Sequence, residues 1–129
     1  MHNDQRTMPD LGTISAFTYK TGQYVGEVVE NTGPRAVMKV LAVLKHPEQG
    51  DLHHPYNPDV PMFHERRALS YTEKANVPLG DIKAFHGEVP AYKASLEHAL
   101  AKEIDALDKL KRWSERGLEQ LEQLAKEYK

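Results

Sequence analysis

Imidazole and carboxylate side chains crowd one stretch of the chain, residues 45–67, which reads KHPEQGDLHHPYNPDVPMFHERR. It holds four of the seven histidines and four of the eight prolines. Such side chains suit zinc, nickel or iron, and a histidine titrating near neutrality can act as a general acid or base. The same groups can also present a surface to a protein partner. The candidate site residues are His46, Asp51, His53, His54, Tyr56, Phe63, His64 and Glu65.

The spacing of these residues argues against a metal site. A catalytic zinc needs three converging protein ligands and one open position. His53 and His54 are adjacent, so their side chains point in different directions in an extended segment, and His64 and Glu65 have the same problem. No HExxH pair is present. We expect no bound metal and favour histidines that hydrogen-bond within the loop. A metal-binding protein or metal-dependent enzyme using this loop is the alternative.

Motifs for other chemistry are also missing. Gly22, Gly26 and Gly33 lie at turns and a bend rather than in a glycine-rich phosphate-binding motif. The sequence contains no nucleophile elbow and no paired carboxylates at catalytic spacing. We therefore expect no catalytic residue, no cofactor and no enzymatic activity.

Composition limits the classes of binding partner and the cellular compartment that we expect. The 129 residues fit one domain, and a formal net charge of −2 with acidic residues interspersed in the loop argues against a nucleic-acid partner. There is no cysteine, which removes disulfides, thiol chemistry and a thioether lipid anchor. No apolar run approaches the ~20 residues that span a bilayer. We expect a cytoplasmic protein without a direct membrane anchor.

The segment that precedes the loop alternates like antiparallel strands, and short runs of the same kind follow it. Turn signals at 20–23 and 31–34 separate the first three runs, and Gly26 predicts a bulge or a close backbone approach. The expected strands are 12–20, 24–30, 36–44 as the central strand, 68–71 and 82–85. Five short, bent strands predict a small SH3-like antiparallel β-barrel over residues 11–88, after a flexible tail at 1–10. A curled antiparallel sheet under helices stays open as an alternative.

The loop itself is predicted to be ordered. Prolines 47, 55, 58 and 61 exclude a helix or a central strand because proline fixes φ and lacks an N–H. A connection this long is usually functional or disordered, and its apolar and aromatic residues argue against disorder. We therefore expect a proline-stiffened loop that acts as a recognition surface.

From Pro90 onward the apolar spacing changes to that of a helix. Ser114 and Gly117 predict a break near 112–117, so residues 89–129 are expected to form two amphipathic helices or one kinked helix. Their apolar stripes are expected to be buried against the barrel or in a homodimer.

Several blocks of the sequence are distinctive. They are YKTG at 19–22, VLKHP at 43–47, QGDLHHP at 49–55, HER at 64–66, EKANVP at 73–78 and YKASL at 92–96. Together they resemble the kinase-associated protein B family of spore-forming bacilli, over roughly residues 12–128.

This resemblance implies an SH3-like barrel with C-terminal helices. It also implies a regulatory protein that supports a membrane sensor histidine kinase at the head of the sporulation phosphorelay. Family members are sometimes labelled lipoproteins, whereas this chain lacks the cysteine that a lipobox requires. We therefore expect any membrane association to go through the kinase partner. The resemblance carries over no catalytic or binding residue.

Overall fold

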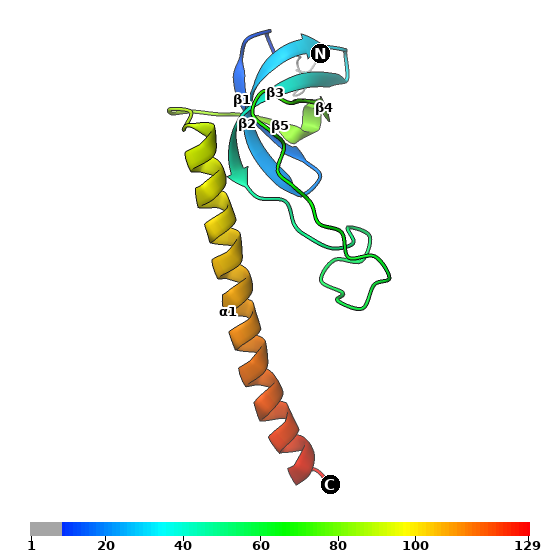
Figure 1. Cartoon of the computed structure of the whole chain (residues 1–129). Helices are drawn as coiled ribbons and strands as arrows, with labels where there is room; N and C mark the ends of the chain where they lie inside the picture. The colour runs from blue at the N-terminus through cyan, green and yellow to red at the C-terminus, as the bar shows by residue number, and fades with distance from the viewer. Residues whose placement is uncertain (1–8) are drawn as a thin grey trace, which may run out of the picture.

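The computed structural model describes residues 9–129 and consists of one antiparallel sheet and one long helix (Figure 1). The elements are β1 (Ile14–Tyr19), β2 (Gly22–Asn31), β3 (Arg35–Lys45), β4 (Lys74–Pro78), the short 3₁₀ helix η1 (Leu79–Asp81), β5 (Ile82–Ala84) and α1 (Tyr92–Glu127). The expected tail at residues 1–10 lies almost wholly outside the described residues. The proposed division of the chain at residue 89 stays a prediction.

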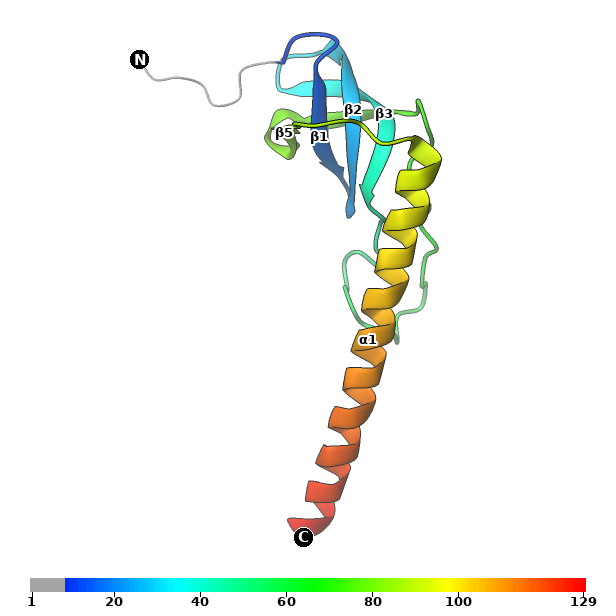
Figure 2. The same cartoon turned by 90° about the vertical axis from the view of Figure 1, so that its left-hand side faces the viewer.

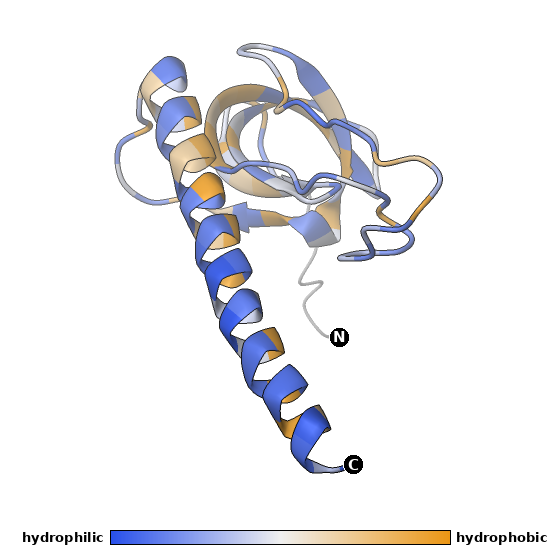
Figure 3. Ribbon diagram, turned by 60° about the horizontal axis from the view of Figure 1, so that its bottom comes forward, coloured by the Kyte–Doolittle hydropathy of each residue, from blue (hydrophilic) through white to orange (hydrophobic). Residues whose placement is uncertain are grey.

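The sheet has the strand order β4-β3-β2-β1-β5, and each neighbouring pair is antiparallel. The predicted meander of the first three strands is confirmed. The central strand of the five-stranded sheet, however, is β2 rather than the expected β3. The sheet does not close into the predicted β-barrel, because β4 and β5 are its two edges and share no ladder. The sheet is instead strongly curled, as Figure 3 shows.

Gly26 lies where the β2–β3 register shifts, as the sequence predicted. A Cβ added to Gly26 would lie 2.7 Å from the backbone oxygen of Lys39 and 2.8 Å from the Phe17 ring. No other residue fits this close approach without displacing the backbone of β3. Bulges bend a strand and increase its twist, so the shifts along β2 account for the curl of the sheet.

The fourth strand lies later in the chain than the sequence indicated. Residues 68–71 are not a strand, whereas β4 covers residues between the expected strands 68–71 and 82–85. The backbone of this earlier segment bonds to side chains instead: Leu69 N donates to the Tyr24 hydroxyl at 3.2 Å, and Tyr92 donates its hydroxyl to Leu69 O. Burial raises the pKa of both tyrosines. Pro78 ends β4 without conflict, because β4 is an edge strand.

The core lies inside the curl of the sheet and under the first turns of α1. Its buried members are Phe17, Tyr24, Val28, Ala36, Met38, Val40, Val43, Ala75, Val77 and Ala99. The helix is fixed to β3 through Ser95, whose Oγ accepts a hydrogen bond from Val43 N at 2.9 Å and donates to Tyr92 O at 2.7 Å. This serine satisfies a buried backbone donor that the strand ladder leaves free.

Helix α1 is a single element, so the predicted break at 112–117 is wrong. One glycine costs a helix only about 1 kcal/mol. Ion pairs one turn apart, Asp105–Lys109 at 3.6 Å and Asp108–Arg112 at 2.9 Å, support the preceding turns. With 36 residues the helix is about 54 Å long and extends well past the sheet (Figures 1 and 2).

The expectation that the apolar stripes of the C-terminal segment are buried is met only at its start. Ser95 and Ala99 are the buried residues of α1, and Leu96 is half-buried against the core. The apolar residues beyond Ala99 remain largely exposed. No helix of the described residues is long and apolar enough to cross a membrane.

Candidate functional site

The two ends of the His/Pro-rich loop are joined at its base. Gly50 N donates to His64 O at 2.9 Å. The Gln49 side chain accepts from Arg66 N at 2.7 Å and donates to Arg66 O at 2.9 Å. These bonds hold the two ends of the loop side by side, so that its outer part extends from the sheet as a compact lobe (Figure 1).

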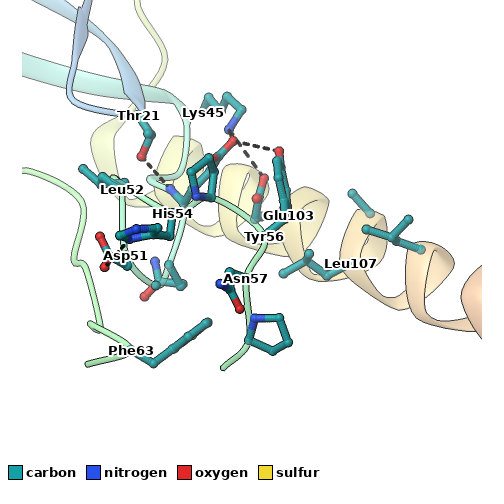
Figure 4. A pocket seen from close by; sticks show the side chains of 17 residues that line it. Thr21, Lys45, Asp51, Leu52, His54, Tyr56, Asn57, Phe63, Glu103 and Leu107 are labelled. Carbon is teal, nitrogen blue, oxygen red and sulfur yellow. Dashed lines mark hydrogen bonds and ion pairs between the residues drawn. The ribbon is translucent and has the colours of Figure 1, made fainter. Parts of the chain in front are cut away.

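The base of the loop is also fixed to the sheet and to α1. Glu48 N donates to the Thr21 hydroxyl at 2.8 Å. Lys45 at the end of β3 lies 3.7 Å from Glu48 and 3.9 Å from Glu103 of the helix. Figure 4 shows these groups meeting at one corner of a groove. The loop therefore has a defined position relative to both other parts of the molecule.

Asp51 organises the first turn of the lobe. Its carboxylate accepts from His53 N at 2.9 Å and pairs with His54 Nδ1 at 3.1 Å. Hydrogen bonding from His53 N, and then from the His54 ring, lowers the pKa of Asp51 below its usual value. An aspartate that bonds the backbone two residues later is a typical turn former. The carboxylate therefore serves the loop's own structure.

The candidate histidines do not converge. The His46 ring is 3.0 Å from Pro47 O at the base, whereas His53, His54 and His64 are exposed along the lobe. Glu65 pairs with Arg67 at 3.6 Å rather than with a histidine. Within residues 9–129, no three His, Asp or Glu side chains are grouped as metal ligands. Nothing in this part of the chain favours the metal alternative, and the absence of metal stays a prediction.

The aromatic candidates are both largely exposed on the lobe. Tyr56 is 79% exposed and Phe63 is 62% exposed. Phe63 lies over Gly50, where an added Cβ would come within 2.9 Å of the ring. Gly50 has a φ of 101°, so a side chain there would also strain the backbone. The Phe63 ring thus packs against Gly50, while much of the residue remains open to solvent.

The lobe and α1 form the two walls of a groove with a volume of about 690 Å³ (Figure 4). Asp51, His54, Tyr56 and Phe63 line it from the loop. Glu103, Ala106, Leu107 and Leu110 line it from the helix. A second hollow of about 530 Å³ is lined by His46 and Glu65 on one side and by Leu100 and Ile104 on the other.

The structure therefore brings six of the eight candidate residues to these two adjoining hollows and leaves His53 and His64 outside them. Sequence reasoning missed the helical wall, because the stripe of Leu100, Ile104 and Leu107 was assigned to buried packing. Its length was the available signal, since the apolar spacing continues for more turns than a small sheet can cover.

Exposed aromatic and aliphatic side chains around a groove, without a converging set of reactive groups in the described residues, are typical of a protein that binds other proteins. Comparison with known proteins gives the family. The family model for kinase associated protein B matches residues 19–129. The chain belongs to the kinase-associated protein B family.

Two relatives are similar over most of their length. The kinase-associated lipoprotein B of Bacillus subtilis (strain 168) is 46% identical over 120 residues, which are 92% of this chain and 94% of the relative. The crystal structure of kinase-associated protein B from Bacillus cereus is 38% identical and has a TM-score of 0.67. That likeness covers 94% of this chain and 98% of the solved one. The family name links the chain to a kinase and suggests an accessory role.

Proposed function

We propose that this chain is a non-enzymatic regulatory protein that binds a sensor histidine kinase and supports its activity in the sporulation phosphorelay. The family to which the chain belongs is named for association with a kinase. The chain would act in the cytoplasm and reach the membrane through the kinase. The loop lobe is the proposed contact surface.

The observation that carries this proposal is the closed base of the lobe. Gln49, Gly50 and Arg66 join its two ends, and prolines stiffen the part between them. A segment that is already ordered loses little conformational entropy on binding, so more of its contact energy appears as affinity. A lobe held in this way is suited to recognition.

Tyr56 and Phe63 are the proposed anchors. Aromatic residues supply a large share of the hot spots in protein interfaces, and both side chains are exposed. His53, His54 and His64 are exposed on the same loop and offer donors and acceptors that would give specificity. Because His53 and His64 lie outside the groove, the proposed surface is the outer face and rim of the lobe rather than the groove alone.

The test is a binding measurement between the full chain and membranes that contain the kinase. We expect Tyr56→Ala and Phe63→Ala to weaken capture of the kinase about tenfold or more. Both should leave the melting temperature nearly unchanged, because the side chains are exposed. Leu11→Ala, which removes a side chain outside the loop that is about as exposed as Phe63, is the matched control and should bind normally.

The result separates recognition from a purely structural role. If the loop only covers one end of the sheet, the same substitutions should cost about 1–3 kcal/mol of unfolding free energy through lost packing. Normal kinase binding by folded Tyr56 and Phe63 variants would contradict the proposal.

A further inference from the structure

The outer part of α1 carries a long apolar face that no other part of the described chain covers. Ile104 is 60% exposed, Leu107 50% and Leu121 64%, on a helix whose first turns pack against β3. Figure 3 shows apolar residues recurring along the helix as it leaves the sheet. An isolated amphipathic helix is marginally stable in water, since most helical stability comes from packing of its apolar face.

The spacing of this face is that of a coiled coil. Leu100, Leu107, Ser114, Leu121 and Tyr128 recur every seven residues. Glu103, Leu110, Gly117 and Leu124 form a second series with the same period, three residues after the first. Alternating steps of three and four keep both series on one side of a helix, which is the pattern that packs against another helix.

Gly117 has no explanation within one chain. It lies inside α1, where glycine costs about 1 kcal/mol relative to alanine. A Cβ added there would meet nothing within 4 Å, so no contact of the described chain requires its absence. Small residues on a helix face allow the backbone of a second helix to approach closely, and Ser114 lies one turn before Gly117 on the same face.

The leucines are placed symmetrically about these two small residues. Leu110 precedes Ser114 by four positions, as Leu121 follows Gly117 by four. Leu107 and Leu124 are each seven positions away on the two sides. In an antiparallel pair, Ser114 of one helix faces Gly117 of the other, and leucine then faces leucine on both sides. We infer that α1 pairs with α1 of a second copy in this antiparallel register.

Charge in the paired face favours the antiparallel direction over the parallel one. Glu103 belongs to the second series of the heptad pattern. In a parallel pair, Glu103 of one helix would face Glu103 of the other, with two like charges at the same level of the contact. In the antiparallel register, Glu103 faces Tyr128 instead.

The register also accounts for the helical wall of the groove. Because Leu107 and Leu110 of one copy face Leu124 and Leu121 of the other, the C-terminal half of the second helix lies along that wall. The paired segment of α1, residues 104–127, is between three and four heptads or about 36 Å long. Such a length is in the range in which heptad patterns form stable coiled coils. This inference does not rest on the proposed kinase contact.

The first test is the solution mass of the full chain by light scattering. One chain has a mass of 14.7 kDa, so a dimer should give about twice that value at micromolar concentration. Leu110→Glu places a charge in the paired face and should weaken the dimer about tenfold or more. Adding Leu121→Lys to the same chain should recover much of that loss, because positions 110 and 121 face each other in the antiparallel register. A mass of one chain at every concentration overturns the inference, as does a Leu110→Glu variant that dimerises normally.

Cross-linking then tests the direction, and the absence of native cysteine makes this simple. Leu107→Cys and Leu124→Cys should cross-link to each other when the two variants are mixed, and neither should cross-link to itself. Self-linking of Leu107→Cys would indicate a parallel pair and contradict the proposed register. Circular dichroism of each variant confirms that α1 is still formed.

Discussion

The first turns of α1 and its longer outer part have the same kind of apolar face in different surroundings. Over its first turns, Ser95 and Ala99 are buried against β3, and Ser95 bonds to the strand backbone. Beyond Ala99 the face continues with leucine and isoleucine at similar spacing and is open to solvent. The comparison shows that a sequence pattern predicts a face to be buried without specifying whether the same chain or another one buries it.

The largest difference between the two regions should appear in the cost of removing an apolar side chain. Met38→Ala empties a fully buried position in β3 and should lower the free energy of unfolding by about 2–5 kcal/mol. Leu118→Ala on the outer helix should change it by less than about 0.5 kcal/mol. Urea unfolding should be measured at a concentration low enough for the light-scattering mass to be that of one chain. A comparable loss in Leu118→Ala would mean that the outer helix packs on its own chain.

The two serines of α1 sharpen the same comparison. Ser95→Ala removes the acceptor of Val43 N in a buried site, which should cost about 1–3 kcal/mol. Ser114→Ala is the matched control and should be neutral or stabilising by about 0.5 kcal/mol in the single chain, because alanine is the better helix former. Equal changes in the free energy of unfolding at the two positions would contradict the distinction between the packed first turns of α1 and its unpacked outer part.

The smallest effect concerns Asp51 and the loop lobe. The folded pKa of Asp51 lies below its value of 3.8 in the unfolded chain, so its bonds to His53 and His54 contribute fully above pH 3.8. That contribution is lost as the pH falls through the lower, folded pKa. We expect NMR signals of the lobe to shift in that acidic range before those of the sheet, and Asp51→Asn to remove the shift. A titration of Asp51 at or above its usual pKa would disprove the hydrogen-bonded turn.

Much of the sheet could be predicted because its signals are local. The first three strands follow from alternation between clear turn residues, and Gly26 marked the bulge. The fourth strand was misplaced because residues 68–71 are as apolar as a strand, while the chain bonds Leu69 to Tyr24 and Tyr92. Whether this segment forms a strand or bonds to side chains therefore depends on residues distant in the sequence. Whether the sheet closes depends likewise on the relation of β4 to β5, which no local pattern specifies.

The site was predictable in part for a related reason. Residue types identified the loop, and its prolines indicated stiffness, but the bonds from Gln49 to Arg66 that close its base link positions far apart in the sequence. The helical wall was missed because the apolar stripe of the helix was expected to be buried, and the full length of α1 was missed because Gly117 was interpreted as a helix breaker. One glycine among good helix formers weakens a helix without ending it, so its role must be sought in what approaches that face.

Amide hydrogen exchange along α1 tests the central claim, that its outer face is covered by a second copy. Residues 92–99 should be protected at every protein concentration, because they are packed on the sheet. Residues 104–127 should be protected at high concentration and should exchange rapidly after dilution below the dissociation constant of the dimer. Rapid exchange of residues 104–127 at all concentrations would contradict the account.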